Sequence, residues 1–182
     1  ENIPPENYAP ALNGLLPKDI RVLKSGRAPD GFNARFSAKR KTYRYTFYVS
    51  AVERPLYERY AVRTLPLDTE KMRAAAAALV GEKDFKCFCA ANSSVKDTVR
   101  TLYSLEVERR GGFITVTACG NGFLYNMVRI VAGTLAAAGE GKLSVEDVKK
   151  IVEGGKRAEG KTMPAKGLCL LSVEYGGALH NI

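Results

Sequence analysis

The chain has 182 residues, and its 28 lysines and arginines against 19 acidic residues give a net charge of +9. This excess favours a polyanionic partner, with nucleic acid as the leading candidate, because cations near phosphates gain Coulomb energy and release condensed counterions. The single histidine, His180, excludes a chemistry built on histidine triads, dyads or metal clusters. The length and the 46% hydrophobic content predict a single domain over residues 1–182.

The four cysteines, Cys87, Cys89, Cys119 and Cys169, form no Cys-x-x-Cys pair. Zinc ligation needs such pairs or histidines, so we expect no metal site, and we interpret the cysteines as reduced and buried in a cytoplasmic protein. The longest apolar stretch, residues 123–139, is too short to cross a bilayer and is interrupted by polar residues. We therefore expect no membrane segment.

Periodicity and turn signals predict the secondary structure, beginning with a short helix that has proline in its first turn and ends before Pro17. In the strand predicted over residues 41–49, Tyr43, Tyr45 and Phe47 alternate with polar residues and so share one face. In chain order the predicted elements are a helix within residues 4–16, strands over 20–23 and 41–49, a helix over 69–80, strands over 98–108 and 113–119, helices over 123–138 and from 145 onward, and a strand over 168–173. This order is typical of an α+β fold in which a largely antiparallel sheet has helices packed on one face.

Positive charge is concentrated in residues 31–52, which contain no aspartate or glutamate. Basic residues that alternate with aromatic ones suit RNA, because cations hold the backbone and rings stack on unpaired bases. The alternative is an amphipathic strand whose basic face is solvated and whose aromatic residues lie in the core. The cations of this stretch are Arg35, Lys39, Arg40, Lys41 and Arg44.

Arg129 lies in an apolar helix, on the face that it shares with Asn126, Gly133 and Ala136. The small residues let another element approach closely, so we expect this face to be buried. A guanidinium there needs a carboxylate, a phosphate or carbonyl partners, because an unpaired buried charge is costly. Arg129 therefore either forms a structural ion pair or positions a catalytic carboxylate.

Six short segments stand in a fixed order along the chain, and together they are specific although any one alone would be weak. They are residues 12–20 (LNGLLPKDI), 32–38 (FNARFSA), 41–45 (KTYRY), 81–85 (GEKDF), 123–129 (FLYNMVR) and 164–168 (PAKGL). In this order they resemble the tRNA pseudouridine synthases of the TruA type. The resemblance covers nearly the whole chain, which looks like the C-terminal catalytic and RNA-binding portion of such a synthase.

The resemblance implies an isomerase that acts without a cofactor on uridines of the tRNA anticodon stem-loop, at tRNA positions 38, 39 or 40. The target base would be flipped from the stack, detached from C1′, rotated and rejoined through carbon to give pseudouridine. It also implies tRNA as the partner and a homodimer that shares tRNA between its subunits.

Roles for individual residues follow from the same resemblance. Tyr43, in the Lys-x-Tyr motif, would pack against the flipped uracil, and Arg129, in the Met-Val-Arg motif, would pair with the catalytic aspartate. Cations and hydroxyls elsewhere would hold the tRNA backbone. The residues expected to contact tRNA are Phe32, Asn33, Ala34, Arg35, Phe36, Lys39, Arg40, Lys41, Arg44, Asn92, Ser93, Ser94, Val95 and Lys96.

The nucleophilic aspartate of the resembling family lies in a Gly-Arg-Thr-Asp-x-Gly-Val-His-Ala motif, upstream of the segment that begins here at Leu12. No such motif occurs in the 182 residues. Asp30 follows Gly26 and Arg27 in a similar run, but a proline precedes it and Val-His-Ala is missing, so it does not fit the role. We expect the nucleophile upstream of Glu1, and we expect the 182 residues alone to be inactive.

Two other classes of protein stay open. A noncatalytic RNA-binding domain would be basic too, although the glycine-containing signature of the RNA-recognition motif is absent from the strand at residues 44–49. An inert structural domain with a solvated basic face would show no salt-dependent binding to an anticodon stem-loop, whereas either RNA-binding class would.

Overall fold

A computed structural model describes residues 3–91, 95–154 and 161–176 of the chain. The chain divides into two compact units, one made of Glu1–Lys39 with Glu174–Ile182 and the other of Arg40–Val173. The single domain expected over residues 1–182 stays a prediction.

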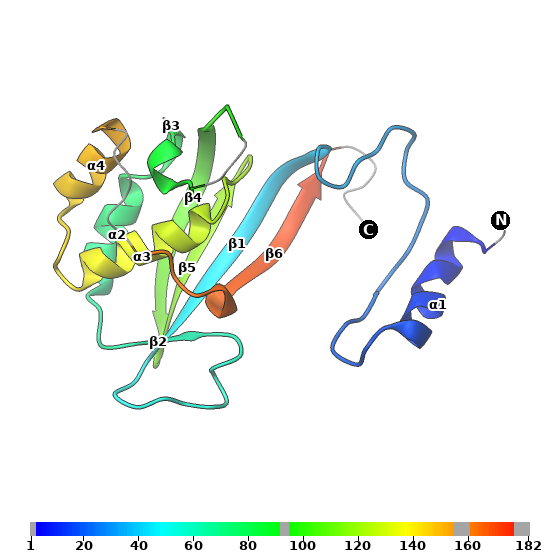
Figure 1. Cartoon of the computed structure of the whole chain (residues 1–182), viewed down its shortest axis with the longest axis horizontal. Coiled ribbons are helices and arrows are strands. Elements are labelled where there is room, and N and C mark those ends of the chain that lie inside the picture. The colour runs from blue at the N-terminus through cyan, green and yellow to red at the C-terminus, as the bar shows by residue number, and fades with distance from the viewer. Residues whose placement is uncertain (1–2, 92–94, 155–160, 177–182) are drawn as a thin grey trace. The chain divides into compact units, whose positions relative to one another are not determined.

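The described residues form a six-stranded sheet in the order β2-β1-β5-β4-β3, and β6 also pairs with β1 (Figure 1). The pairs β1–β5, β5–β4 and β4–β3 are antiparallel, and β1–β2 is parallel. The largely antiparallel sheet predicted from the sequence is therefore confirmed. The strands are β1 (Ala38–Val49), β2 (Val62–Thr64), β3 (Gly81–Asp84), β4 (Val99–Arg110), β5 (Phe113–Gly120) and β6 (Leu168–Tyr175).

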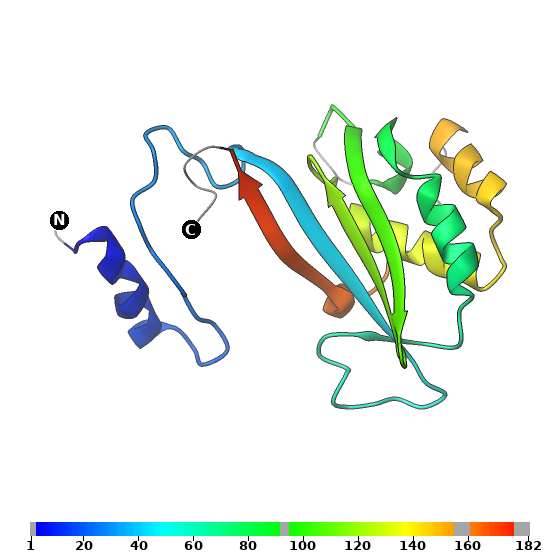
Figure 2. The same ribbon diagram turned by 180° about the vertical axis from the view of Figure 1, so that it is seen from behind.

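Helices α2, α3 and α4 cover one face of this sheet, as Figures 1 and 2 show from opposite sides. The α+β class with helices on one face is thus confirmed. The helices are α1 (Tyr8–Leu15), α2 (Thr69–Ala77), α3 (Met127–Gly139) and α4 (Val145–Gly154), and single 3-10 turns lie at Pro5–Asn7, Lys86–Phe88 and Ala165–Gly167.

The core lies between α3 and the sheet. Strand alternation sends Tyr45 and Phe47 of β1 inward, where both are fully buried, and Ile114 and Val116 of β5 follow the same rule. Every residue of α3 except Arg129 and Ala137 is buried. A helix this apolar is stable only when surrounded by protein, so α3 is the central element of the second unit.

Three local differences from the sequence-based expectation have physical reasons. The strand predicted over residues 20–23 is wrong: the backbone there bonds to a side chain, because Asn13 accepts from the Val22 N–H and donates to its carbonyl, both at 2.8 Å. Helix α3 begins at Met127 rather than near 123, because Asn126 adopts a left-handed conformation with φ 58°. All four cysteines are free thiols, but only Cys87 is buried as expected: Cys89 and Cys119 are partly buried, and Cys169 is exposed.

The strands β2 and β3 were missed because each is only three or four residues long. Short segments carry too little alternation to be distinguished from loops. Within the part of the chain that the structure describes, no helix is long and apolar enough to cross a membrane.

The N-terminus of α2 is capped by Asp68, and this cap can be tested by mutation. The Asp68 carboxylate accepts hydrogen bonds from the backbone N–H groups of Glu70 and Lys71 at 3.0 and 3.1 Å. Asp68→Ala removes this cap, and we expect it to lower the free energy of unfolding by about 1 kcal/mol in urea denaturation. Asp68→Asn, which retains an acceptor oxygen, should lose much less, and equal losses would contradict the assignment of the cap.

Candidate functional site

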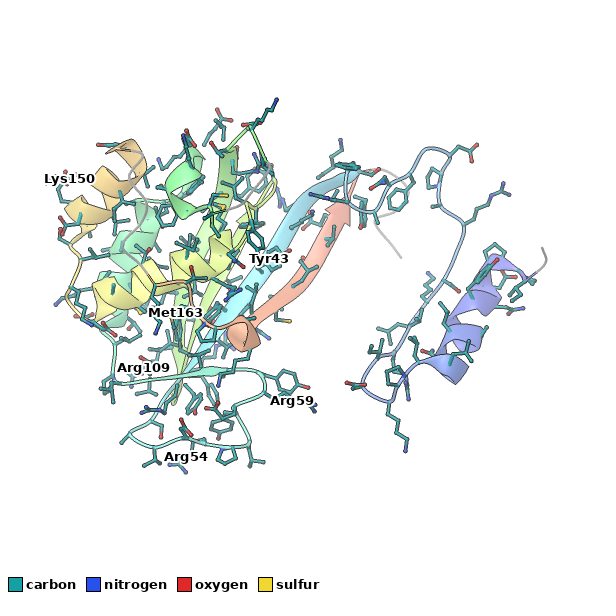
Figure 3. The ribbon with its side chains drawn as sticks, viewed as in Figure 1. Tyr43, Arg54, Arg59, Arg109, Lys150 and Met163 are labelled. Carbon is teal, nitrogen blue, oxygen red and sulfur yellow. The ribbon has the colours of Figure 1, made fainter. Side chains whose placement is uncertain are left out.

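Arg129 is held in one orientation by two oxygen acceptors. Its Nε donates to the Met163 carbonyl at 2.6 Å, and its Nη1 donates to Asn126 Oδ1 at 2.8 Å. The Met163 N–H donates in turn to the Arg129 carbonyl at 3.3 Å, so the segment bearing Met163 runs alongside α3 (Figure 3). The sequence predicts a carboxylate, a phosphate or a carbonyl as the partner of Arg129. The fold supplies a carbonyl, that of Met163.

No carboxylate among the described residues lies within ion-pair distance of Arg129. The guanidinium is partly buried and oriented, yet its charge is not neutralised by the groups that hold it. A fixed cation of this kind attracts a carboxylate or a phosphate more strongly than a mobile surface arginine does, because part of its hydration has already been removed.

Gly133, one turn after Arg129, lets the Met163 segment lie against α3. A β-carbon at Gly133 would overlap the Lys161 carbonyl oxygen. Only a glycine permits this approach, and the approach brings the Met163 carbonyl to the Arg129 Nε. The sequence pattern of small residues on this helix face thus predicted a close contact correctly.

Asn126 positions Arg129 at some cost to its own backbone. It is the described non-glycine residue with a positive φ, a conformation that costs about 1–3 kcal/mol, least for asparagine. Its side chain makes no cap hydrogen bond to α3 and is instead bonded to Arg129. Strain combined with a side chain committed to a charged group is typical of a functional site.

Tyr43 lies on β1, on the face that is covered by α3 (Figure 3). Its ring meets Phe123 edge to face, with centroids 5.1 Å apart. Tyr45, two residues on and on the same face, donates its hydroxyl to the Pro164 carbonyl at 2.7 Å. Burial raises the pKa of Tyr45, and the nearby Arg129 cation opposes that shift. Tyr43 and Arg129 are therefore on the same side of the sheet, and Tyr45 lies next to both.

The basic stretch of β1 is divided between the two faces of the sheet. Lys41 shares the face of Tyr43 by strand alternation, whereas Arg40 and Arg44 point to the opposite face. There the Arg40 guanidinium stacks over the Tyr103 ring, 4.7 Å from its centroid. A single RNA strand lying along Tyr43 would therefore contact the cations of one face and not those of the other. The composition of the chain could not show that the cations are divided between two faces. Contact of these residues with tRNA stays a prediction.

Residues 32–36 form a tight turn in the first unit. The Asn33 side chain accepts hydrogen bonds from the backbone N–H groups of Arg35 and Phe36 at 2.9 and 3.1 Å. The Arg35 guanidinium lies 5.5 Å from the Phe36 ring centroid, and Phe36 is 78% exposed. An exposed ring paired with a cation is suited to a base or a phosphate, and contact of this turn with tRNA stays a prediction.

The remaining predicted tRNA contacts fall in several places. Phe32 and Ala34 both contact Tyr175, through a ring contact at 5.0 Å and a hydrogen bond from the Tyr175 hydroxyl to the Ala34 carbonyl at 3.0 Å. Lys39 lies on an exposed position of β1, and Val95 and Lys96 are exposed. Asn92, Ser93 and Ser94 lie outside the described residues.

Sequence reasoning missed the Met163 carbonyl as part of the site. The contact joins residues 34 positions apart through a backbone oxygen, and no residue type marks a backbone oxygen in a sequence. Asn126 could have been found, because it stands three residues before Arg129 on the same helical face. Among the described residues no cluster of three histidine, cysteine or acidic side chains could hold a metal ion.

Comparison with known proteins gives the class to which this fold and site belong. A family model described as tRNA pseudouridine synthase matches residues 75–176, a range that contains α3 with Arg129 and the segment with Met163. The chain belongs to the tRNA pseudouridine synthase family.

Individual relatives are similar over almost the whole chain. Proteins named tRNA pseudouridine synthase A from Bacillus velezensis and Bacillus subtilis are 48% and 46% identical, each over 96% of this chain and 71% of the relative. The protein of the same name from a Geobacter species is 43% identical over 96% of this chain and 72% of its own length. The resemblance inferred from six short segments is confirmed.

The close approach at Gly133 can be tested by adding one methyl group. Gly133→Ala should lower the free energy of unfolding by about 1–3 kcal/mol, because the new β-carbon overlaps the Lys161 carbonyl. Gly14→Ala is the matched control, since Gly14 lies in α1 with open space around it and alanine is the better helix former there. Denaturant unfolding should show a lower free energy of unfolding for Gly133→Ala and a higher one for Gly14→Ala. A free energy of unfolding that is unchanged in Gly133→Ala would contradict the packing described.

Proposed function

We propose that the protein isomerises uridine to pseudouridine in tRNA, with its targets in the anticodon stem-loop. Membership of the tRNA pseudouridine synthase family supports the reaction. The observation that carries the proposal for this site is the Arg129 guanidinium, which Asn126 and Met163 hold in place and which has no ion-pair partner among the carboxylates of the described residues. An oriented cation on the same side of the sheet as Tyr43 suits a reaction in which a carboxylate and a uracil must be brought together.

The reaction needs no atom beyond those of the substrate and water. The N1–C1′ bond breaks, a C5–C1′ bond forms, the proton on C5 leaves and N1 gains one, so the product is an isomer of the uridine. Flipping the base out costs a few kcal/mol of stacking. Tyr43, whose ring is steadied by Phe123, would offset part of that cost by packing against the uracil.

Arg129 would act as the partner of the nucleophilic aspartate. An opposite charge within a few ångströms keeps a carboxylate ionised and orients it, and the two bonds from Arg129 fix where that carboxylate can lie. The family motif that carries the aspartate is not among these 182 residues. We therefore propose that the nucleophile lies upstream of Glu1, and we use the term full-length protein for a chain that also contains such a segment.

The proposal extends to the partners expected from the resemblance. The substrate tRNA would be held by cations such as the partly buried Lys41, which shares the face of Tyr43, and by the turn at residues 32–36. Two copies of the full-length protein would share a tRNA as a homodimer, acting in the cytoplasm without a cofactor. Light scattering during gel filtration measures this association directly.

The first test concerns the 182 residues themselves. Pseudouridine formation releases the hydrogen on C5, so tRNA carrying tritium at C5 of uridine reports turnover. Without the Gly-Arg-Thr-Asp motif, the 182-residue chain should release no tritium above the buffer control. Measurable release would show that a carboxylate within the chain is the nucleophile and would overturn the assignment upstream of Glu1.

The second test concerns Arg129 in the full-length protein. Arg129→Ala should lower kcat at least about 100-fold, because the carboxylate loses the cation that orients it, while the Kd for tRNA changes little. Arg129→Lys retains the charge but lacks the planar guanidinium whose Nε and Nη1 bond to Met163 and Asn126, so it should lose a large part of the activity as well. Unchanged turnover in Arg129→Ala would contradict the proposed role. Salt-dependent tRNA binding by a full-length protein that never releases tritium would instead favour a noncatalytic RNA-binding domain.

A further inference from the structure

The turn that precedes α3 joins the two halves of the candidate site. At its start the Phe123 ring packs against Tyr43, with centroids 5.1 Å apart. At its end Asn126 Oδ1 accepts a hydrogen bond from Arg129 at 2.8 Å. Tyr125 stands between these two contacts in the chain, and its side chain is 59% exposed. The turn therefore presents one aromatic ring to solvent within two residues of both site contacts.

The backbone around Tyr125 is held on both sides. The Tyr125 carbonyl accepts a hydrogen bond from the Ala90 N–H at 3.0 Å, which ties the turn to the segment after the 3-10 turn at Lys86–Phe88. The Met127 N–H donates to the Leu124 carbonyl at 3.0 Å, and Leu124 itself is buried. A ring on a backbone held in this way gives up little conformational entropy when a ligand covers it, because only the two side-chain torsions remain to be ordered.

An exposed tyrosine alone is ordinary on a protein surface. What distinguishes Tyr125 is its place in the chain next to Asn126, which has a positive φ and a side chain that accepts a hydrogen bond from Arg129. When a target uridine leaves the stack, its neighbour in the strand loses a stacking partner. An exposed ring that is close in the chain to both site contacts can replace that partner, and base–aromatic stacking is tolerant of base identity.

We propose that Tyr125 is a base-stacking residue, whose ring contacts a nucleobase next to the uridine that Tyr43 would pack against. This inference rests on the proposed function, since it takes tRNA as the ligand. It adds a second aromatic contact to the site and places it at the N-terminal end of α3. The two rings would flank the RNA strand at the point where the base is flipped.

Three variants of the full-length protein test the proposal by tRNA binding in a fluorescence anisotropy titration. Tyr125→Ala should raise the Kd by roughly 5-fold to 150-fold, the equivalent of one lost stacking contact. Tyr125→Phe retains the ring and should bind like the unchanged protein. The matched control is Tyr60→Ala, because Tyr60 is 72% exposed in the loop between β1 and β2, and it should not change the Kd.

The salt dependence of binding separates stacking from charge. The tyrosine ring carries no charge, so removing it does not change the number of counterions that are released when tRNA binds. The slope of log Kd against log salt concentration should therefore be the same for Tyr125→Ala as for the unchanged protein. A thermal melt confirms that Tyr125→Ala is folded, as expected for an exposed side chain. If the slope falls, or if Tyr60→Ala weakens binding as much, the effect is not stacking at Tyr125 and the proposal fails.

A fluorescent base locates the contact in the RNA. An anticodon stem-loop is made with 2-aminopurine on the 5′ or the 3′ side of the target uridine, since stacking on a ring quenches this base. Binding should quench one of the two positions, and Tyr125→Ala should restore its fluorescence at saturating protein while Tyr125→Phe does not. Quenching that is unchanged in Tyr125→Ala at both positions would overturn the proposal.

The outcomes keep this proposal apart from the proposed function. Tritium release by the full-length protein with a Kd unaffected by Tyr125→Ala would leave the function standing and defeat the stacking role. Absence of tritium release together with ring-dependent quenching would defeat the function and retain Tyr125 as an RNA contact.

Discussion

The candidate site depends on the close packing of the Met163 segment against α3. Gly133 has no side chain, so the Lys161 carbonyl can lie against the helix, and the Met163 carbonyl then meets the Arg129 Nε at 2.6 Å. The same segment continues to Pro164, whose carbonyl accepts the Tyr45 hydroxyl at 2.7 Å. One stretch of irregular backbone thus joins the helix to the central strand and holds the cation in a partly buried position. A charge in such a position is costly unless hydrogen-bonded, and here backbone oxygen satisfies it.

The sheet divides the aromatic and basic residues of β1 between its two faces. Tyr43, Tyr45 and Lys41 share the face of α3, whereas Arg40 and Arg44 belong to the other. The positive charge that suggested a polyanion is therefore not one continuous patch. The face covered by α3 carries the oriented Arg129, whereas Arg40 and Arg44 lie on the opposite face, away from it. The family membership is consistent with RNA as the polyanion to which this basic chain binds.

Much of the fold was predictable because its elements are locally consistent. The alternation over residues 41–49 and the helix over residues 69–80 are each read from neighbouring residues, and β1 and α2 are present there. The strand expected over residues 20–23 failed because a side chain, Asn13, took the hydrogen bonds that a partner strand would have made. Such competition is decided by which groups meet in space, and a propensity for extended backbone does not contain that information.

The sequence by itself determined the kind of site this protein holds. A lone charge on an apolar helix face with glycine and alanine required a close neighbour and a polar partner, and the ordered motifs gave the family. Only the tertiary structure decided which groups meet that requirement, namely the Asn126 side-chain oxygen and the Met163 carbonyl. It also decided that Tyr125, which precedes Asn126, is an exposed ring. The reason is physical: residue types and periodicity are local properties of the chain, whereas a backbone carbonyl is the same at every position and acquires a role only from its place in the fold.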